Sequence, residues 1–297
     1  MTRQEWRPRL VAIDVDGTLP AWAEVEEQAP EPPGSRLGRA LQGALDAGAH
    51  VVLCSGRSPH GITRVVDRLR LVGQNGERMW MVASNGSVVC RYSPLEVVYR
   101  ESFDAGPAVR AFVDRCPSAL VAVEHELGYR LTGRFPAGEL PGEMIVTKLA
   151  EIIAQPANRV IIRDPAATPE EFARLAAELD LPNADHSVGW TAWLDLTAVD
   201  VTKTSGLRYV CGELGLTAVD VLAIGDGRND IEMLRWAGRG VAVGQAPQEV
   251  RDAADAVTAA AEDDGVALEL ERWFGLADAD APVDRVAGAE AGGPATC

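Results

Sequence analysis

The 297-residue chain has few cysteines, no long apolar run and a shortage of basic residues. Its five cysteines are an odd number with no Cys-X-X-Cys pair, which indicates reduced thiols in a cytoplasm rather than a disulfide framework. No apolar run approaches the roughly 20 residues that a membrane span needs, and Asp14 interrupts the first run where a signal peptide would need its apolar centre. We therefore expect a cytoplasmic protein with no membrane partner.

Lysine and arginine together number 28 against 44 acidic residues, so the formal net charge is −16. This balance argues against a protein that binds nucleic acid or anionic membranes through charge. It does not exclude small anionic substrates, because a bound cation can reverse the field inside a pocket. The histidines His60, His125 and His186 lack the spacing of zinc ligands, so we expect no zinc site.

The length suggests about two domains, and alternating strand and helix patterns predict a doubly wound α/β core. Helical periodicity is clear where Leu37, Leu41 and Leu45 recur every four residues, and again over 207–214. The carboxyl ends of parallel strands meet at one edge of such a sheet, where ligands bind. Polar groups that directly follow apolar runs are therefore candidates for a ligand site.

Four apolar runs end in this way. The run 10–14 ends at Asp14 and Asp16, which could supply a nucleophile and a proton shuttle or could simply cap a loop. The other runs are 51–54, which leads into Ser55-Gly56-Arg57; 79–82, which leads into Ser84-Asn85-Gly86; and 219–224, which leads into the acidic stretch 225–230. Lys203 opens the helical pattern before the last run. Together these segments would bring acids, a hydroxyl and one cation to a single edge.

With these residues in place, the sequence resembles the phosphatases of the haloacid dehalogenase (HAD) superfamily, in the Cof-like branch with an α/β cap. The four motifs of the family match 14–18, Ser55 within 54–57, Lys203, and 225–230, in that order. The resemblance extends from residue 8 to about residue 272. One departure is Gln245, where relatives commonly have asparagine.

The resemblance implies a role for each motif residue. Asp14 would attack the phosphorus of a phosphate monoester to form an aspartyl-phosphate, and Asp16 would protonate the leaving oxygen and later activate water. The phosphoryl oxygens would be held by four further residues: Ser55, Gly56, Lys203 and Asn229. A Mg²⁺ ion would be bound by the Asp14 carboxylate, the Asp16 backbone carbonyl and Asp226, with Asp230 as a ligand directly or through water.

Simpler roles remain open for several of these residues. Ser55 alone is more often a helix cap, and a lone Lys203 is more often a solvated surface lysine. Asn229 could cap a helix that begins near Ile231. Arg57 could neutralise Asp67 instead of contacting substrate.

The domain organisation follows from where the motifs lie. We expect a discontinuous HAD-like catalytic core at 1–86 and 192–275, an inserted α/β cap domain at 87–191, and a disordered tail at 276–297. Within the insert the patterns predict a hairpin over 87–90 and 97–101, a helix over 108–114, and a second helix over 172–179 that a capping box at 168–171 opens. Arg130, Arg134 and Trp190 are cap residues that could reach the leaving group, although both arginines could equally be solvated.

The expected function is Mg²⁺-dependent hydrolysis of small phosphate monoesters, with sugar phosphates or related metabolites as substrates. Asp16 favours this chemistry over dehalogenation, because relatives that act as dehalogenases lack an acid at that position. The alternatives are a phosphosugar mutase or phosphotransferase, or a catalytically silent binding protein on the same fold. The expected partner is a small phosphorylated metabolite, and the expected oligomeric state is a monomer or weak homodimer.

Overall fold

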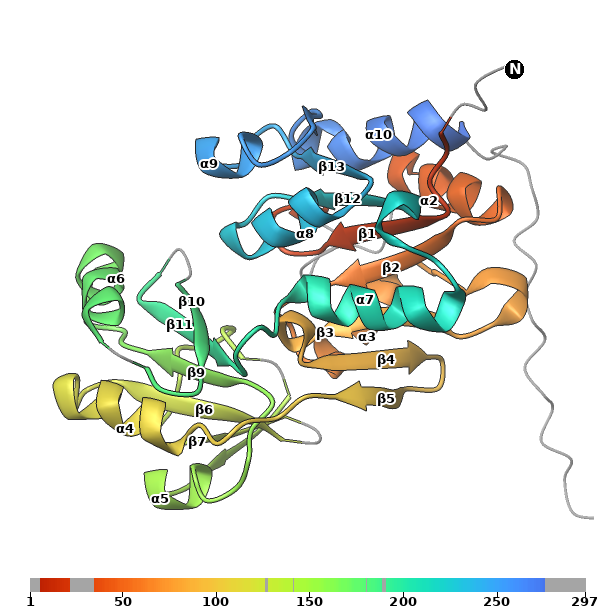
Figure 1. Ribbon diagram of the computed structural model, residues 1–297. Coiled ribbons are helices and arrows are strands. Elements are labelled where there is room, and N and C mark those ends of the chain that lie inside the picture. Colours follow the sequence, from red (N-terminus) through yellow and green to blue (C-terminus); the bar gives the residue numbers. More distant parts are fainter. Residues whose placement is uncertain are drawn as a thin grey trace, which may run out of the picture.

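The computed structural model describes residues 6–21, 35–125, 128–140, 142–179, 181–188 and 191–275. The predicted tail at 276–297 and the cap residue Trp190 lie outside the described residues. Within them the chain forms two sheets, one of eight strands and one of six. Figure 1 shows the eight-stranded core and the six-stranded cap as two lobes.

The core sheet has the strand order β14-β13-β12-β1-β2-β3-β4-β5, and its first six strands run parallel. The central strand β1 is buried at all five positions, which is why its sequence is an unbroken apolar run up to Asp14. The predicted α/β core with a parallel sheet is confirmed. The core strands are β1 (Leu10–Asp14), β2 (His50–Cys54), β3 (Met79–Ala83), β4 (Val88–Tyr92), β5 (Glu96–Arg100), β12 (Val221–Gly225), β13 (Arg239–Ala242) and β14 (Ala256–Val257).

Helices pack on both faces of the core sheet. Helices α7 and α8 contact each other and lie in front of the strands in Figure 1, and α2 packs against α10. None of the helices in the described ranges is long and apolar enough to cross a bilayer. The core helices are α2 (Arg36–Asp46), α3 (Pro59–Arg68), α7 (Lys203–Leu214), α8 (Ile231–Trp236), α9 (Gln248–Arg251) and α10 (Gly265–Phe274).

The cap is a six-stranded sheet in the order β10-β11-β9-β6-β7-β8. Helices α4 and α6 share one apolar cluster with the sheet, in which the rings of Phe112 and Phe172 lie 5.1 Å apart. The predicted capping box forms at the start of α6, between Thr168 and Glu171. The cap elements are α4 (Gly106–Arg115), β6 (Leu120–His125), β7 (Gly128–Leu131), β8 (Glu143–Val146), α5 (Leu149–Ile152), β9 (Val160–Arg163), α6 (Pro169–Glu178), β10 (Asp185–Val188) and β11 (Trp193–Thr197).

Both domain boundaries expected from the sequence disagree with the way the strands pair in the two sheets. The hairpin β4–β5 extends the core sheet, because β4 pairs antiparallel with β3 from Met79↔Tyr92 to Ala83↔Val88. At the other boundary, β11 belongs to the cap sheet, where it pairs with β9 and β10. The local pattern of the hairpin predicts two strands correctly but carries no information on which sheet they join. The positive φ of Gly86, +102°, reverses the chain and lays β4 back onto β3.

Candidate active site

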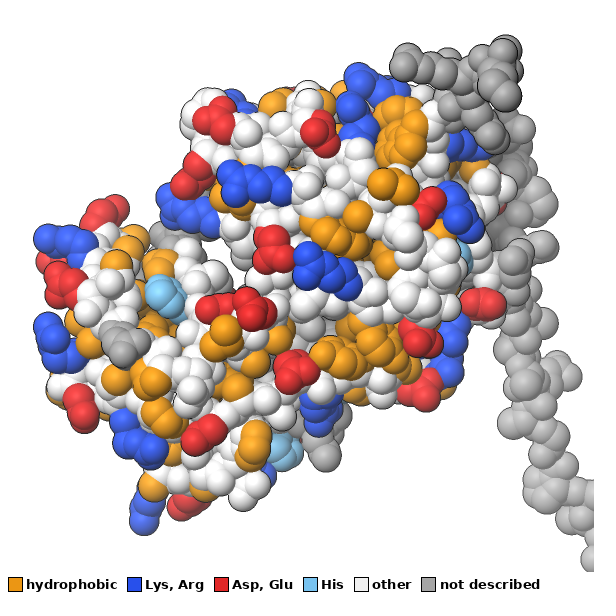
Figure 2. Space-filling model, viewed as in Figure 1, with side chains coloured by type: hydrophobic (Ala, Val, Ile, Leu, Met, Phe, Trp, Pro, Cys, Tyr) orange, Lys and Arg blue, Asp and Glu red, His pale blue; other side chains and the backbone are white. Residues whose placement is uncertain are grey.

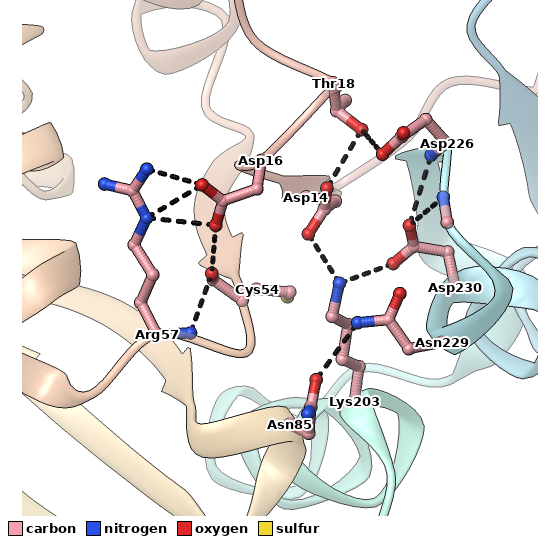
Figure 3. Close-up of polar contacts among 12 residues, drawn as sticks. Asp14, Asp16, Thr18, Cys54, Arg57, Asn85, Lys203, Asp226, Asn229 and Asp230 are labelled. Atoms are coloured by element: carbon pink, nitrogen blue, oxygen red, sulfur yellow. Dashed lines mark hydrogen bonds and ion pairs between the residues drawn. The ribbon is translucent and has the colours of Figure 1, made fainter. Parts of the chain in front are cut away.

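The carboxyl ends of three neighbouring core strands bring the predicted site together. Strand β1 ends at Asp14 and lies between β12, which ends just before Asp226, and β2, which ends just before Ser55. Figure 3 shows the side chains from these strand ends converging, together with Lys203 at the start of α7. The expected edge of the sheet is therefore where these residues meet.

Three carboxylates crowd this edge. Asp14, Asp226 and Asp230 each offer an oxygen, and these oxygens lie within 4.8 Å of one another. Burial raises the pKa of Asp14 well above its usual range, and the nearby Asp230 charge adds to the effect. Burial and Asp230 likewise raise the pKa of Asp226. The cluster thus carries more negative charge than its surroundings stabilise, which is the condition for binding a cation.

Lys203 is the cation at the centre of this cluster. Its Nζ lies 2.5 Å from Asp14 Oδ1 and 2.7 Å from Asp230 Oδ1, and the side chain is 1% exposed. Burial alone would lower the pKa of Lys203, but the two carboxylates outweigh burial and raise it. The reading of Lys203 as a solvated surface lysine is therefore wrong. Its partners in the structure are the two carboxylates.

Asp230 shapes the loop that carries Asp226. Asp230 Oδ2 accepts hydrogen bonds from the backbone N–H groups of Asp226, at 3.1 Å, and Gly227, at 2.9 Å, while Oδ1 binds Lys203. Both of its oxygens therefore have protein partners. Thr18 joins the other two acids, because its hydroxyl lies 3.1 Å from Asp14 Oδ2 and 3.1 Å from Asp226 Oδ1.

The turn after β1 leaves room for glycine alone. Gly17 has φ of +83°, and a Cβ at this position would lie 2.4 Å from Asp226 Oδ2. Gln245 secures the same turn, since its Nε2 donates to the Gly17 carbonyl at 2.5 Å and its Oε1 accepts from the Ala261 N–H at 3.0 Å. The residue that departs from the family pattern therefore bridges two loops at the edge of the site.

Asp16 lies beside the acidic cluster and faces the loop after β2. Its side chain is 52% exposed and pairs with Arg57, whose Nη2 lies 2.5 Å from Asp16 Oδ1. The Ser55 hydroxyl donates to Asp16 Oδ2 at 3.2 Å and accepts from the Arg57 N–H at 3.0 Å. Arg57 therefore pairs with Asp16, and the expected alternative partner Asp67 instead accepts a hydrogen bond from Tyr92.

Two of the simpler roles are also wrong. Helix α3 begins at Pro59 and is capped by the Ser58 side chain, so Ser55 is not its cap. Helix α8 has Asp230 at its N-cap position, and Asn229 instead donates from Nδ2 to Asn85 Oδ1 at 3.0 Å. Gly56 lies against the same amide, because a Cβ there would be 3.2 Å from Asn85 Oδ1. Two of the residues predicted to bind phosphate, Gly56 and Asn229, thus lie against the Asn85 side chain.

A cleft of about 470 Å³ opens beside Lys203 and Asn229, between these core loops and β10 of the cap. On the face seen in Figure 2 the molecule is hollowed between its two lobes. His186 and Ser187 line the cap wall of the cleft, and Glu232 is part of the core wall. The predicted cap contacts Arg130 and Arg134 are exposed, and Arg130 Nη2 lies 3.2 Å from His125.

The sequence analysis did not identify one set of charged residues in the cap. Arg159, Glu124 and Asp195 form a buried ion cluster in the cap that reaches the core at Ser84. The signal was available, because Asp195 alternates with the apolar Leu194 and Leu196 and therefore marks a polar position on one face of a strand.

Comparisons with known proteins agree with this geometry. The pattern that defines the haloacid dehalogenase-like hydrolases matches residues 11–119 and 143–270, so the chain belongs to that family. It is 27% identical over 282 residues to the putative phosphatase YxeH of Bacillus subtilis, covering 87% of this chain and 96% of YxeH. It is 29% identical over 269 residues to a phosphoglycolate phosphatase of Methanothermobacter thermautotrophicus, covering 90% and 99% of the two chains.

The fold is also similar to that of a solved sugar phosphatase of HAD subclass IIB, BT4131. The TM-score is 0.72 at 23% sequence identity, and the match covers 89% of this chain and 98% of the other. At this identity the likeness establishes the fold alone. With the family match and the phosphatase relatives, the prediction of a Cof-like hydrolase of the phosphatase class is confirmed.

Proposed function

We propose that the protein is a Mg²⁺-dependent phosphatase that hydrolyses small phosphate monoesters through an aspartyl-phosphate on Asp14. The observation that carries the proposal is the buried Asp14 carboxylate at the end of β1, held by Lys203 at 2.5 Å and by the Thr18 hydroxyl at 3.1 Å. A carboxylate fixed in this way can attack in line, and phosphoryl transfer depends mostly on such positioning.

The two aspartates divide the reaction between them. Asp14 forms a bond to phosphorus as the ester oxygen departs with a proton from Asp16. Asp16 then takes a proton from water, which attacks the same phosphorus, releases inorganic phosphate and regenerates Asp14. Arg57 and Ser55 hold the Asp16 carboxylate in place for both proton transfers.

The donor set fits a hard divalent cation. Carboxylate oxygens of Asp14, Asp226 and Asp230 lie within 4.8 Å of one another, and oxygen ligands are what Mg²⁺ prefers. When bound, Mg²⁺ would offset the negative charge of the phosphoryl oxygens. Asp14, Asp226 and the backbone carbonyl of Asp16 would hold it. Asp230, whose two oxygens have protein partners, would act through water or through the loop it shapes.

The substrate class follows from the size of the cleft and from the relatives. A cleft of about 470 Å³ beside Lys203 and Asn229 suits a small metabolite. The similarity to a phosphoglycolate phosphatase and to a sugar phosphatase supports small phosphorylated acids and sugars as candidates. The leaving group would lie against β10 of the cap.

The test is phosphate release from a panel of small phosphate monoesters by the full-length protein, with Mg²⁺ and with EDTA. The matched control is Asp67→Asn, which alters an exposed carboxylate of α3 that accepts a hydrogen bond from the Tyr92 hydroxyl. The proposal expects release that requires Mg²⁺ and survives this control. Isomerised sugar phosphate without released phosphate would contradict hydrolysis, and turnover that persists in EDTA would contradict the Mg²⁺ dependence.

A further inference from the structure

A buried cluster of charges in the cap reaches the core at the turn after β3. Arg159 binds two carboxylates, with Nη2 lying 2.6 Å from Asp195 and Nη1 lying 3.2 Å from Glu124. The second oxygen of Glu124, Oε2, accepts a hydrogen bond from the Ser84 hydroxyl at 2.5 Å. The side chains of Arg159 and Glu124 are both 6% exposed, so this contact is shielded from water.

Ser84 belongs to a turn that links two loops of the active site. Its N–H donates to the Arg57 carbonyl at 2.8 Å, and the Asn85 N–H donates to the Ser55 carbonyl at 3.1 Å. The Asn85 side chain accepts from Asn229 in the loop after β12. Ser84 and Asn85 have φ of +52° and +54°, a left-handed conformation that non-glycine residues adopt only when the surroundings hold it.

A second contact lies next to the first. Tyr129 of β7 is 2% exposed and hydrogen-bonds to Ser58, three residues beyond Ser55. The cap therefore touches the core at the turn itself and beside the loop after β2. Neither contact involves the acidic cluster itself.

The charges explain why the Ser84 bond matters. Two carboxylates share one guanidinium in the cluster, so one negative charge remains in excess in a buried position. Burial raises the pKa of Glu124, and Arg159 only partly offsets this. A buried carboxylate needs every donor within reach, and a hydroxyl that binds an ionised acceptor makes a stronger bond than one between neutral groups. Ser84 provides that donor only while the cap sits on the core.

We propose that Glu124 is a positioning residue, through which the seated cap holds the Ser84–Asn85 turn and thereby Ser55 and Asn229 in their places. Its consequence for catalysis rests on the proposed function, but the contact and its effect on the turn do not. When the cap lifts, the turn loses the acceptor for Ser84, and the phosphate-binding loops loosen. The site is then complete only in the closed protein, so phosphoryl transfer begins only once the cap encloses the substrate.

The first test measures the turn directly, by hydrogen exchange of the full-length, metal-free protein. Ser84→Ala removes the hydroxyl and leaves the Glu124–Arg159 pair intact. We expect the amides of the turn and of residues 55–58 to exchange about fivefold faster, the effect of losing one hydrogen bond. Asp67→Asn, which weakens a carboxylate–hydroxyl bond elsewhere in the core, should leave these amides unchanged.

Glu124→Gln is the second variant and keeps the shape of the side chain, so it still reports should Ser84→Ala fold poorly. It should accelerate exchange at the same amides. Wild-type exchange rates in either folded variant would overturn the proposal. Because no turnover is needed, this result stands apart from whether the protein is a phosphatase.

The second test separates positioning from simple stabilisation. With Mg²⁺ and p-nitrophenyl phosphate, Ser84→Ala should lower kcat/KM about tenfold. Mg²⁺ affinity should stay at the wild-type value, because none of the hydrogen bonds of Ser84 within the described part of the chain involves Asp14, Asp226 or Asp230. If the wild type does not turn over this ester, the affinity for inorganic phosphate in Mg²⁺ replaces kcat/KM and should fall similarly. Faster exchange with unchanged kcat/KM or phosphate affinity would show a purely structural bond and would overturn the proposal.

Discussion

Lys203 Nζ and Asp14 Oδ1 lie 2.5 Å apart in a site where both side chains are at most 5% exposed. The same ammonium binds Asp230, so one lysine neutralises two buried carboxylates. The Lys203 ammonium lowers the pKa of Asp14, against burial and the Asp230 charge, which together raise it. This pairing also makes Lys203 important for stability as well as for activity.

Replacing Lys203 by methionine should therefore destabilise the protein. The substitution leaves two carboxylates unpaired, which commonly costs about 3 to 5 kcal/mol at a buried site. Urea unfolding in EDTA at neutral pH measures the loss in the free energy of unfolding. The loss should shrink at acid pH, where Asp14 is protonated because its pKa is raised. A loss that does not depend on pH would show that lost packing, rather than lost charge, is responsible.

The response to Mg²⁺ should grow with pH. Because the pKa values of Asp14 and Asp226 are raised in the folded protein, it holds protons that the unfolded chain has released. The free energy of unfolding of the metal-free protein should therefore fall as the pH rises through those raised pKa values. Mg²⁺ needs ionised carboxylates, so its effect on Tm should be small at acid pH and increase toward neutral pH. Thermal unfolding with Mg²⁺ or EDTA across this range tests the sign. A Mg²⁺ effect that is largest at acid pH would contradict it.

Gly17→Ala should weaken metal binding. The added Cβ would lie 2.4 Å from Asp226 Oδ2, and φ of +83° adds backbone strain. Gly48→Ala is the matched control, because its φ is +87° and the nearest atom to its Cβ is 4.0 Å away. Both variants should lose about 1 to 2 kcal/mol from strain, but only Gly17→Ala should lose Mg²⁺ affinity in calorimetry. Equal Mg²⁺ affinities in the two variants would mean that the contact with Asp226 is unimportant.

Asp16→Asn should separate proton transfer from metal binding. Without an acid at residue 16, kcat for alkyl phosphates should fall about 10² to 10⁴-fold, and less for p-nitrophenyl phosphate, whose leaving group needs little protonation. Mg²⁺ affinity should survive, because the expected metal contact of this residue is its backbone carbonyl. Asp226→Asn provides the comparison. A loss of Mg²⁺ affinity as large in Asp16→Asn as in Asp226→Asn would make the Asp16 side chain a ligand.

The sequence alone predicted the strand ends well. Asp14, Ser55 and Asp226 each follow an apolar run, and buried parallel strands must read as such runs. It could not predict the placement of the hairpin β4–β5, because the pattern of a half-buried strand does not identify its neighbour. The sequence also could not predict which side chains would pair with one another. From the sequence, Arg57 could neutralise Asp67 or contact substrate, and only the folded loop shows that it pairs with Asp16.

The sequence also could not predict how the charged residues of the cap strands pair. Glu124, Arg159 and Asp195 come from three cap strands or their ends, and no local spacing connects them. Their pairing depends on the strand order of the cap sheet, which is set by long-range contacts. Gln245 was recognised as a departure from the family, but its bridge to Gly17 and Ala261 exists only once two distant loops meet.

The most direct test of the account is the covalent intermediate. The full-length protein is mixed with Mg²⁺ and a phosphate ester from the panel that it hydrolyses, quenched in acid within one turnover, treated with borohydride, and mapped by peptide mass spectrometry. An aspartyl-phosphate would be reduced to homoserine, and we expect homoserine at residue 14, absent from untreated protein and from Asp14→Asn, which should also lose activity by several orders of magnitude. Turnover by Asp14→Asn at the wild-type rate, or modification at another residue, would contradict the assignment of Asp14 as the nucleophile.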